Sequence, residues 1–342
     1  MSEPSAVLDA LSDVLEQVER AMREALRSDG ALAPLIGEHV LGSGGKRLRP
    51  ALVSLAAALC GYTGPRRVQI GAAVELLHTA TLLHDDVVDL AQLRRGRASA
   101  NAVWGNRRAV LVGDFLYARA SSMIVEDGDL DILEIFSNTI RLMAEGELLQ
   151  LERSFDPTVT EAHYYSVIDR KSAELLSAAC DAGAILAGVT RAERRRLAEF
   201  GRQVGLAFQL RDDALDYSAE AKALGKLPCA DLREGKVTLP LLLALKRCSA
   251  AEREAADAVI KTAGRRAATL AAEGISDPAQ VLSEADLAPV VEIVRRNRGI
   301  EDTDRRAQEH VARAEAALAP FPDGPSRRAL LEAAQFVVSR AH

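Results

Sequence analysis

The sequence contains few aromatic residues and few cysteines. Only 4% of its 342 residues are Phe, Trp or Tyr, although 48% are hydrophobic. Because alanine and leucine supply much of this hydrophobic content, the composition favours packed helices over a β-sandwich. The four cysteines are Cys60, Cys180, Cys229 and Cys248. They are widely scattered and show no CxxC spacing, so we interpret them as thiols in a reducing compartment.

The sequence also lacks a surplus of positive charge and long apolar runs. Its net charge is −6, and basic residues alternate with acidic ones, which argues against a nucleic-acid-binding surface. The purely apolar stretches, such as Leu55–Cys60, are far shorter than the ~20 residues that span a membrane. Residues 1–10 show no signal-peptide pattern. We therefore expect a soluble, cytoplasmic protein.

Apolar residues recur every three or four positions along most of the chain, as expected for amphipathic helices. We predict helices over roughly residues 7–22, 50–59, 68–90, 109–126, 130–155, 161–187, 191–218 and 239–245, and shorter charged helices over 250–342. A Gly-rich segment at 41–50, a polar loop at 225–236 and a turn at 320–325 interrupt this pattern. Because no linker composition marks a boundary, we predict one all-α domain over residues 1–342.

Two short acidic runs with the pattern Asp-Asp-x-x-Asp lie within apolar helical sequence. Their carboxylates are Asp85, Asp86 and Asp89 in the first run, and Asp212, Asp213 and Asp216 in the second. The first and last aspartates of each run share a helix face, where like charges repel unless a cation lies between them. Carboxylate oxygens at this spacing suit Mg²⁺, which binds through a few carboxylates together with substrate phosphates. The runs therefore predict two halves of a metal–diphosphate site.

Basic and polar residues accompany the acidic runs. Lys46 and Arg49 lie on the Gly-rich turn, where backbone N–H groups and two cations can meet an anion. This turn is not a P-loop, because it lacks GxxxxGK[ST] and follows a helix. His78 lies two helical turns before Asp85. The other candidates are Arg94, Arg95, Lys171, Gln209, Lys226 and Lys236. Together they predict two anion sites, one containing acids with Mg²⁺ and one containing cations alone.

Several motifs resemble those of the trans-polyprenyl diphosphate synthase family. They are GGKRLRP at 44–50, ELLHTATLLHDDVVD at 75–89, LRRGRASAN at 93–101, LVGDFLYARA at 111–120, QLRDDALDY at 209–217 and GKLPCADLREGKVTLP at 225–240. The resemblance implies an all-α bundle around a central cavity and a homodimer. It also implies isopentenyl diphosphate and an allylic diphosphate, such as farnesyl diphosphate, as substrates. About three Mg²⁺ ions are expected with substrate bound, and at most peripheral membrane contact during product release.

The resemblance also implies roles for individual residues. Asp85, Asp89 and Asp212, and less directly Asp86, Asp213 and Asp216, would bind the Mg²⁺ that holds the allylic diphosphate. Arg94, Lys171, Gln209 and Lys226 would contact this diphosphate, with Lys236 nearby, and Asp85, Asp89, Lys171, Asp212 and Lys226 form the catalytic set. Lys46, Arg49, His78 and Arg95 would bind isopentenyl diphosphate. Ser172 stands where the family usually has Thr and offers the same hydroxyl group.

The residues that set product length are predicted from the same resemblance. Short-chain members place bulky aromatic residues just before the first acidic run, whereas this chain has Ala80 and Thr81. Small residues leave the tunnel open, which predicts a product of roughly eight to ten isoprene units, about as long as a helix of ~25 residues. Such products form the side chains of respiratory quinones. Met123 and Phe136 are candidates for the tunnel floor, although both also fit as ordinary core residues.

Four other functions fit part of the pattern. A terpene cyclase also uses an acidic run and Mg²⁺, but it needs no isopentenyl site of the kind that Lys46 and Arg49 predict. A phosphohydrolase of the HD type is suggested by His84 and Asp85, yet its histidine ligands should be spread along the chain. A non-catalytic subunit usually loses one acidic run, and this chain keeps both. A shorter-chain synthase, making farnesyl or geranylgeranyl diphosphate, stays an alternative.

Overall fold

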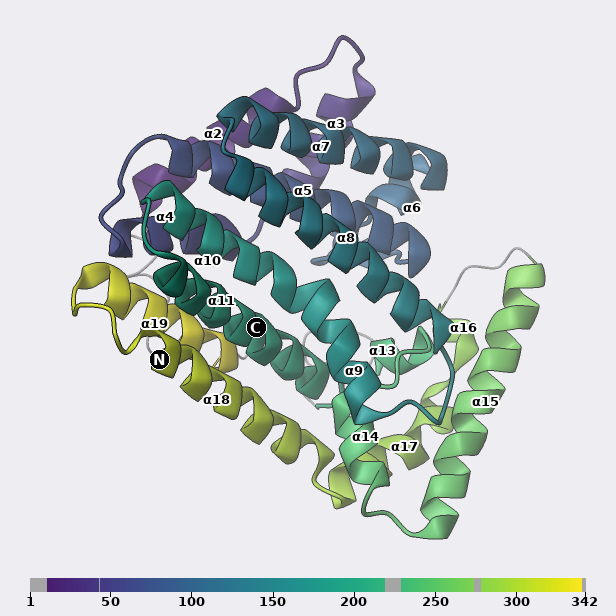
Figure 1. Ribbon diagram of the computed structural model, residues 1–342. Helices are drawn as coiled ribbons and strands as arrows, with labels where there is room; N and C mark the ends of the chain where they lie inside the picture. The colour runs from purple at the N-terminus through teal and green to yellow at the C-terminus, as the bar shows by residue number, and fades with distance from the viewer. Residues whose placement is uncertain (1–10, 43, 219–228, 274–277, 340–342) are drawn as a thin grey trace. The chain divides into compact units, whose positions relative to one another are not determined.

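The computed structural model describes residues 11–42, 44–218, 229–273 and 278–339, and nearly all its regular structure is helical (Figure 1). The chain divides into two compact units. Unit 1 comprises Met1–Arg141, Glu174–Arg202 and Ala314–Phe336, and unit 2 comprises Leu142–Ala173, Gln203–Arg313 and Val337–His342. The all-α prediction is confirmed, and the single domain over 1–342 stays a prediction. No helix among the described residues is long and apolar enough to cross a membrane.

Unit 1 contains most of the N-terminal helices. They are α2 (Ser12–Ala25), α3 (Leu32–Leu41), α4 (Leu48–Leu59), α5 (Arg66–Val88), α6 (Ala100–Trp104), α7 (Asn106–Asp127) and α10 (Glu174–Leu186). Helix α5 packs along α7 and also contacts α4 and α2 (Figure 1). A Cβ added at Gly183 of α10 would lie 2.5 Å from the carbonyl oxygen of Val53, so the close approach of α10 to α4 requires glycine.

Helix α5 changes character along its length. Most residues from Val68 to Ala80 are buried, whereas most residues of the last two turns, which carry the first acidic run, are half-buried or exposed; Leu83 and Asp86 are the buried exceptions. The apolar first part anchors the helix in the core of unit 1. Its C-terminal end therefore holds the acidic run at the surface of that unit on a rigid element.

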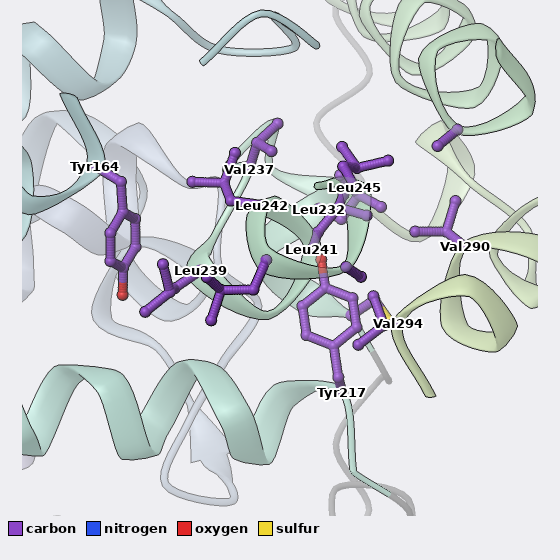
Figure 2. Packing of buried hydrophobic residues seen from close by; sticks show 14 of the residues in the cluster. Tyr164, Tyr217, Leu232, Val237, Leu239, Leu241, Leu242, Leu245, Val290 and Val294 are labelled. Carbon is purple, nitrogen blue, oxygen red and sulfur yellow. The ribbon is translucent and has the colours of Figure 1, made fainter. Parts of the chain in front are cut away.

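Unit 2 is built around α14 (Leu239–Leu245), whose seven residues are all buried. Its other helices are α9 (Glu161–Ile168), the π-helical segment η1 (Asp169–Ala173), α13 (Ala230–Arg233), α15 (Ala250–Ala272), α16 (Pro278–Val281) and α17 (Glu284–Arg296). Figure 2 shows the apolar cluster, to which Leu239 and Leu242 of α14 and Val290 and Val294 of α17 belong, and α14 packs against α17. Four further helices have residues in both units: α8 (Leu130–Glu152), α11 (Arg191–Asp216), α18 (Gly299–Leu318) and α19 (Pro325–Ser339).

The predicted helices are largely confirmed, with four corrections. The helix predicted over 161–187 is interrupted by η1, and the loop predicted over 225–236 contains α13. The helices after residue 250 are not short, since α15 has 23 residues and α18 has 20. Two strands that the sequence did not suggest, β1 (Leu93–Arg94) and β2 (Arg97–Ala98), pair antiparallel. Periodicity detects long amphipathic helices, whereas these short elements depend on turn and packing geometry.

Candidate functional site

A basic pocket lies in unit 1, between the Gly-rich turn, α5 and the β1–β2 hairpin. Its cavity volume is small, about 20 Å³, and the pocket is partly open to solvent. Its lining includes Arg47, Glu75, His78, Asp86, Arg94, Arg95 and Arg97. Four arginines thus face two carboxylates, so the pocket favours an anionic ligand. The structure brings together here three of the predicted binding residues, His78, Arg94 and Arg95.

The two-residue loop of the hairpin places Arg95 in the pocket. Arg95 and Gly96 have φ angles of 51° and 75°, the left-handed conformations that a tight two-residue hairpin loop requires. A non-glycine residue rarely adopts this conformation unless the surrounding structure holds it there. A Cβ added at Gly45 would lie 2.9 Å from Nη1 of Arg95. The Gly-rich turn therefore lets the backbone approach this guanidinium closely.

Arg47 and Glu75 belong to the pocket, although the sequence analysis did not single them out. Nη1 of Arg47 lies 3.2 Å from Oε1 of Glu75, and Nε of Arg47 lies 3.3 Å from Oε1 of Glu19. Glu75 is only 4% exposed. Its position three residues before His78, on the same face of α5, was the available signal. This ion pair fixes the Gly-rich turn against α5.

Burial dominates the electrostatics of Arg49 and His78. Burial lowers the pKa of Arg49, with Glu75 opposing this shift, and the Nε of Arg49 has no hydrogen-bond partner within the described part of the chain. The pKa of His78 is lowered well below 6.5 by burial and then by Arg49 and Arg95. His78 is therefore neutral at physiological pH and can donate one hydrogen bond and accept another. The buried donor of Arg49 suits an incoming anion.

The first acidic run contains one buried carboxylate and two half-buried ones. Asp86 is 4% exposed, and its Oδ1 accepts a hydrogen bond from Nε of Arg94 at 2.8 Å. Burial raises the pKa of Asp86, and the bond from Arg94 opposes that shift. Asp85 and Asp89 are half-buried on one face of α5. They are the members of this run that suit a metal, whereas Asp86 forms an ion pair with Arg94.

Lys46 extends from the Gly-rich turn outside the pocket lining. It is exposed, and its Nζ lies 4.2 Å from the centre of the Phe336 ring of α19. A lysine ammonium at this distance from an aromatic face is stabilised by a cation–π interaction. The predicted grouping of Lys46 with the pocket residues therefore stays a prediction.

The second acidic run lies in unit 2, at the end of α11. The carboxylates of its last two aspartates accept hydrogen bonds from other residues of this unit. The carboxylate of Asp213 accepts hydrogen bonds from the hydroxyl of Tyr164 at 2.5 Å and from Nε2 of Gln209 at 2.8 Å. The carboxylate of Asp216 accepts the backbone N–H groups of Ala230 and Asp231 at 2.9 and 3.2 Å. Burial raises the pKa of both carboxyl groups, and the nearby Asp231 raises it further. Asp212 is half-buried beside them.

Lys171 and Ser172 lie on the π-helical segment η1. Lys171 forms an ion pair with Glu147 of α8, and the Ser172 hydroxyl donates to Oε1 of Gln209 at 2.7 Å. A Cβ added at Gly146 would lie 2.9 Å from the Lys171 backbone nitrogen. At Gly205 an added Cβ would lie 2.5 Å from Cα of Ala173, the last residue of η1. Glycines on both neighbouring helices therefore leave room for this segment, and π-helical turns are frequent at functional sites.

The remaining predicted contacts are placed as follows. Lys236 pairs with Glu234 at 2.7 Å, and its backbone N–H donates to the carbonyl of Asp231 at 2.8 Å. Lys226 lies outside the described residues. Ala80, Met123 and Phe136 are 1%, 8% and 5% exposed, and Thr81 is half-buried. Such burial suits core residues and tunnel residues alike, so the chain-length assignments stay predictions.

The carboxylates fit a metal that is shared with a substrate. No group of three or more His, Cys, Asp and Glu side chains that could hold a metal ion occurs among the described residues. Asp85 and Asp89 supply hard oxygen ligands on one face of a helix, and Asp212 supplies another at the second run. Mg²⁺ commonly binds through one or two carboxylates plus phosphate oxygens and water. The donors of unit 1, and separately Asp212 of unit 2, therefore each fit a metal whose coordination a diphosphate completes.

Comparison with known proteins identifies the family. The polyprenyl synthetase family model matches residues 33–273. The chain is 42% identical to octaprenyl diphosphate synthase from Escherichia coli (strain K12) over 323 residues, which cover 94% of each chain. A crystal structure of polyprenyl synthase from Caulobacter crescentus CB15, complexed with calcium and isoprenyl diphosphate, has a TM-score of 0.90 and 42% identity, covering 99% of this chain and 98% of that one.

A second solved structure extends this similarity. The crystal structure of a decaprenyl diphosphate synthase from Rhodobacter capsulatus has a TM-score of 0.89 and 37% identity, and the match covers 99% of this chain and 100% of that one. The similarity spans both units and both acidic runs rather than a single motif. The chain therefore belongs to the polyprenyl synthetase family of prenyltransferases.

Proposed function

We propose that this chain is a long-chain trans-polyprenyl diphosphate synthase. It adds isopentenyl diphosphate units, head to tail (1′–4), to an allylic diphosphate such as farnesyl diphosphate, and releases diphosphate at each step. The observation that carries this proposal is the basic pocket of unit 1 beside the acidic run of α5. A cyclase that only ionises one allylic diphosphate needs the acidic run, but it does not need a separate pocket of cationic residues that binds a second diphosphate.

The two substrates use different residues. Isopentenyl diphosphate binds to Lys46, Arg49, His78 and Arg95, supported by the buried donor of Arg49 and the convergent charge of the pocket. The allylic diphosphate binds through about three Mg²⁺ to the two acidic runs, with contacts from Arg94, Lys171, Gln209, Lys226 and Lys236. The calcium and isoprenyl diphosphate in the Caulobacter relative support this class of ligand.

The reaction follows from the charges that these residues hold. When bound, Mg²⁺ neutralises negative charge that builds on the departing diphosphate. Lys171 adds a positive charge near the departing diphosphate. The electrostatic stabilisation that it provides is largest in the transition state. Apolar residues of the cavity exclude water, which would otherwise quench the allylic carbocation. The double bond of isopentenyl diphosphate attacks that carbocation, and the released diphosphate accepts the proton that is then lost.

The product is proposed to contain roughly eight to ten isoprene units, a length comparable with ~25 residues of helix. The octaprenyl and decaprenyl synthases among its relatives support this length, as do the small side chains at Ala80 and Thr81. Such a product serves as the side chain of a respiratory quinone. The enzyme acts in the cytoplasm, with at most peripheral membrane contact when the product leaves.

The functional enzyme is proposed to be a homodimer that pairs through α7. Leu111 and Val125 are 59% and 62% exposed on this helix, and Tyr117 is 39% exposed. Leu111, Ala118 and Val125 follow one another at seven-residue spacing, so they share a helix face. Leu111→Glu with Val125→Glu should yield monomers by light scattering, whereas Arg107→Glu on the same helix should stay dimeric. A monomeric wild-type protein would refute this part of the proposal.

One experiment tests the activity directly. Purified protein receives Mg²⁺, farnesyl diphosphate and radiolabelled isopentenyl diphosphate, and the dephosphorylated products are separated by reversed-phase chromatography. Labelled products near C40–C50 support the proposal, whereas C20 products indicate a shorter-chain synthase. A cyclised product formed without isopentenyl diphosphate indicates a terpene cyclase. No incorporation by the wild type would overturn the proposal.

A further inference from the structure

Tyr164 is a buried polar residue to which neither the motifs nor the proposed mechanism gives a role. It lies on α9 and is 5% exposed, with its ring in the apolar cluster of unit 2 (Figure 2). Its hydroxyl donates to Oδ2 of Asp213 in the second acidic run at 2.5 Å. A buried tyrosine normally finds one hydrogen-bond partner. Here that partner is a carboxylate of a proposed metal-binding run.

The bond from Tyr164 is the end of a longer chain of hydrogen bonds. The other oxygen of Asp213, Oδ1, accepts from Nε2 of Gln209 at 2.8 Å. The amide oxygen of Gln209 accepts from the hydroxyl of Ser172 at 2.7 Å. Three successive bonds therefore join α9, α11 and η1 within unit 2. A buried network of satisfied bonds fixes the orientation of its members.

We propose that Tyr164 is a positioning residue that orients Asp213, and with it the second acidic run, for binding a Mg²⁺–diphosphate. This inference rests on the proposed function. Each oxygen of Asp213 is held by one neutral donor, so the plane of the carboxylate is fixed. Each oxygen also keeps a second lone pair that points away from its donor. Without the Tyr164 hydroxyl, one oxygen loses its donor, and the orientation of the carboxylate is then fixed only by the bond from Gln209.

A purely apolar role of the ring predicts a different outcome from a positioning role. Tyr164→Phe keeps the ring in the cluster and removes only the hydroxyl, so core packing is retained. Tyr165 is a matched control, because it follows on the same helix and its ring lies 5.6 Å from that of Tyr164. The charged group that affects the Tyr165 hydroxyl most is Arg306, which does not belong to the acidic run. Tyr165→Phe therefore removes an equivalent hydroxyl from another environment.

Two measurements test the proposal on the full-length chain. The first is the rise in melting temperature when Mg²⁺ and inorganic diphosphate are added together, which reports binding without turnover. The second is the Mg²⁺ dependence of the condensation rate. For Tyr164→Phe we expect a smaller thermal shift and an increase of about three- to tenfold in the Mg²⁺ concentration for half-maximal rate, the scale of one lost hydrogen bond. The KM for isopentenyl diphosphate should be unchanged.

The outcomes separate this inference from the proposed function. If wild-type protein makes no product, the proposed function fails, while the thermal shift with Mg²⁺ and diphosphate still decides the role of Tyr164. If Tyr164→Phe shows the wild-type shift and Mg²⁺ dependence, Tyr164 has no positioning role. The same conclusion follows if Tyr165→Phe changes both by the same factor, or if Tyr164→Phe only lowers the melting temperature of the ligand-free protein.

Discussion

Arg94 donates from Nε to the buried carboxylate of Asp86 at 2.8 Å, so the two residues form an ion pair beneath the exposed end of α5. Asp85 and Asp89, on either side of Asp86 in sequence, stay half-buried at the surface. Three aspartates of one motif are therefore of two kinds. Two are half-buried and are the proposed metal ligands, and the third forms an ion pair with the arginine that follows the helix.

This division predicts opposite effects of two neighbouring substitutions. Asp85→Ala should lower turnover by several orders of magnitude, because a metal ligand needed mainly in the transition state is lost. Its melting temperature should be unchanged or slightly higher, since a like-charge repulsion with Asp89 has gone. Asp212→Ala should behave in the same way. Steady-state kinetics and circular dichroism measure both properties, and near-normal turnover at excess Mg²⁺ would contradict the assignment.

Asp86→Ala should instead reduce stability. The change leaves the partly buried guanidinium of Arg94 without its carboxylate, which costs about 1–3 kcal/mol after allowance for the exposure of Arg94. Chemical denaturation measures this loss. The double variant Asp86→Ala with Arg94→Met should recover part of it, and no recovery would mean that the two residues are not energetically coupled.

Arg49→Ala should raise the KM for isopentenyl diphosphate about ten- to hundredfold, because a charge-assisted hydrogen bond contributes roughly 1.5–3 kcal/mol. The KM for farnesyl diphosphate should change much less, and Lys46→Ala should show the same selectivity. Arg107→Ala, an exposed arginine of α7, is the control. Equal effects on both substrates would show that the two anion sites are wrongly separated.

Ala80→Phe should shorten the product to roughly farnesyl or geranylgeranyl length while condensation continues. Ala80 lies five residues, about 7.5 Å of helix rise, before Asp85. Thr81→Phe, about 100° further round the helix, should shorten the product less cleanly. Chromatography of the products is read together with the melting temperature, because Ala80 is only 1% exposed. Full-length product from a stable Ala80→Phe variant would place Ala80 away from the tunnel.

His78 predicts a dependence of stability on pH. Its pKa in the folded protein is well below the usual 6.5, because burial and the neighbouring arginines disfavour the imidazolium. The unfolded chain therefore binds a proton that the folded chain does not, as pH falls below about 6.5. Stability attributable to His78 is present above that pH and is lost as pH falls. Melting temperatures between about pH 5 and 7.5 should fall less steeply for His78→Gln, and an identical slope would contradict this account.

The sequence predicted those features that depend on local spacing. The long helices and the two Asp-Asp-x-x-Asp runs follow from periodicity and composition. The π-helical segment around Lys171 could not be predicted, because it depends on the space that Gly146 and Gly205 leave on other helices. The pairing of Arg47 with Glu75 also joins distant segments, although each residue lay inside a quoted motif. Long-range packing, rather than local pattern, decides these features.

The left-handed backbone of Arg95, at φ 51°, puts stability and binding in conflict at one position. Glycine would relieve a conformational cost of about 1 kcal/mol there, yet it would remove the guanidinium from the pocket. A selection for heat resistance alone would thus favour a hairpin with two glycines and discard a proposed substrate contact. Any programme that stabilises this enzyme must therefore screen position 95 for substrate affinity as well as for melting temperature.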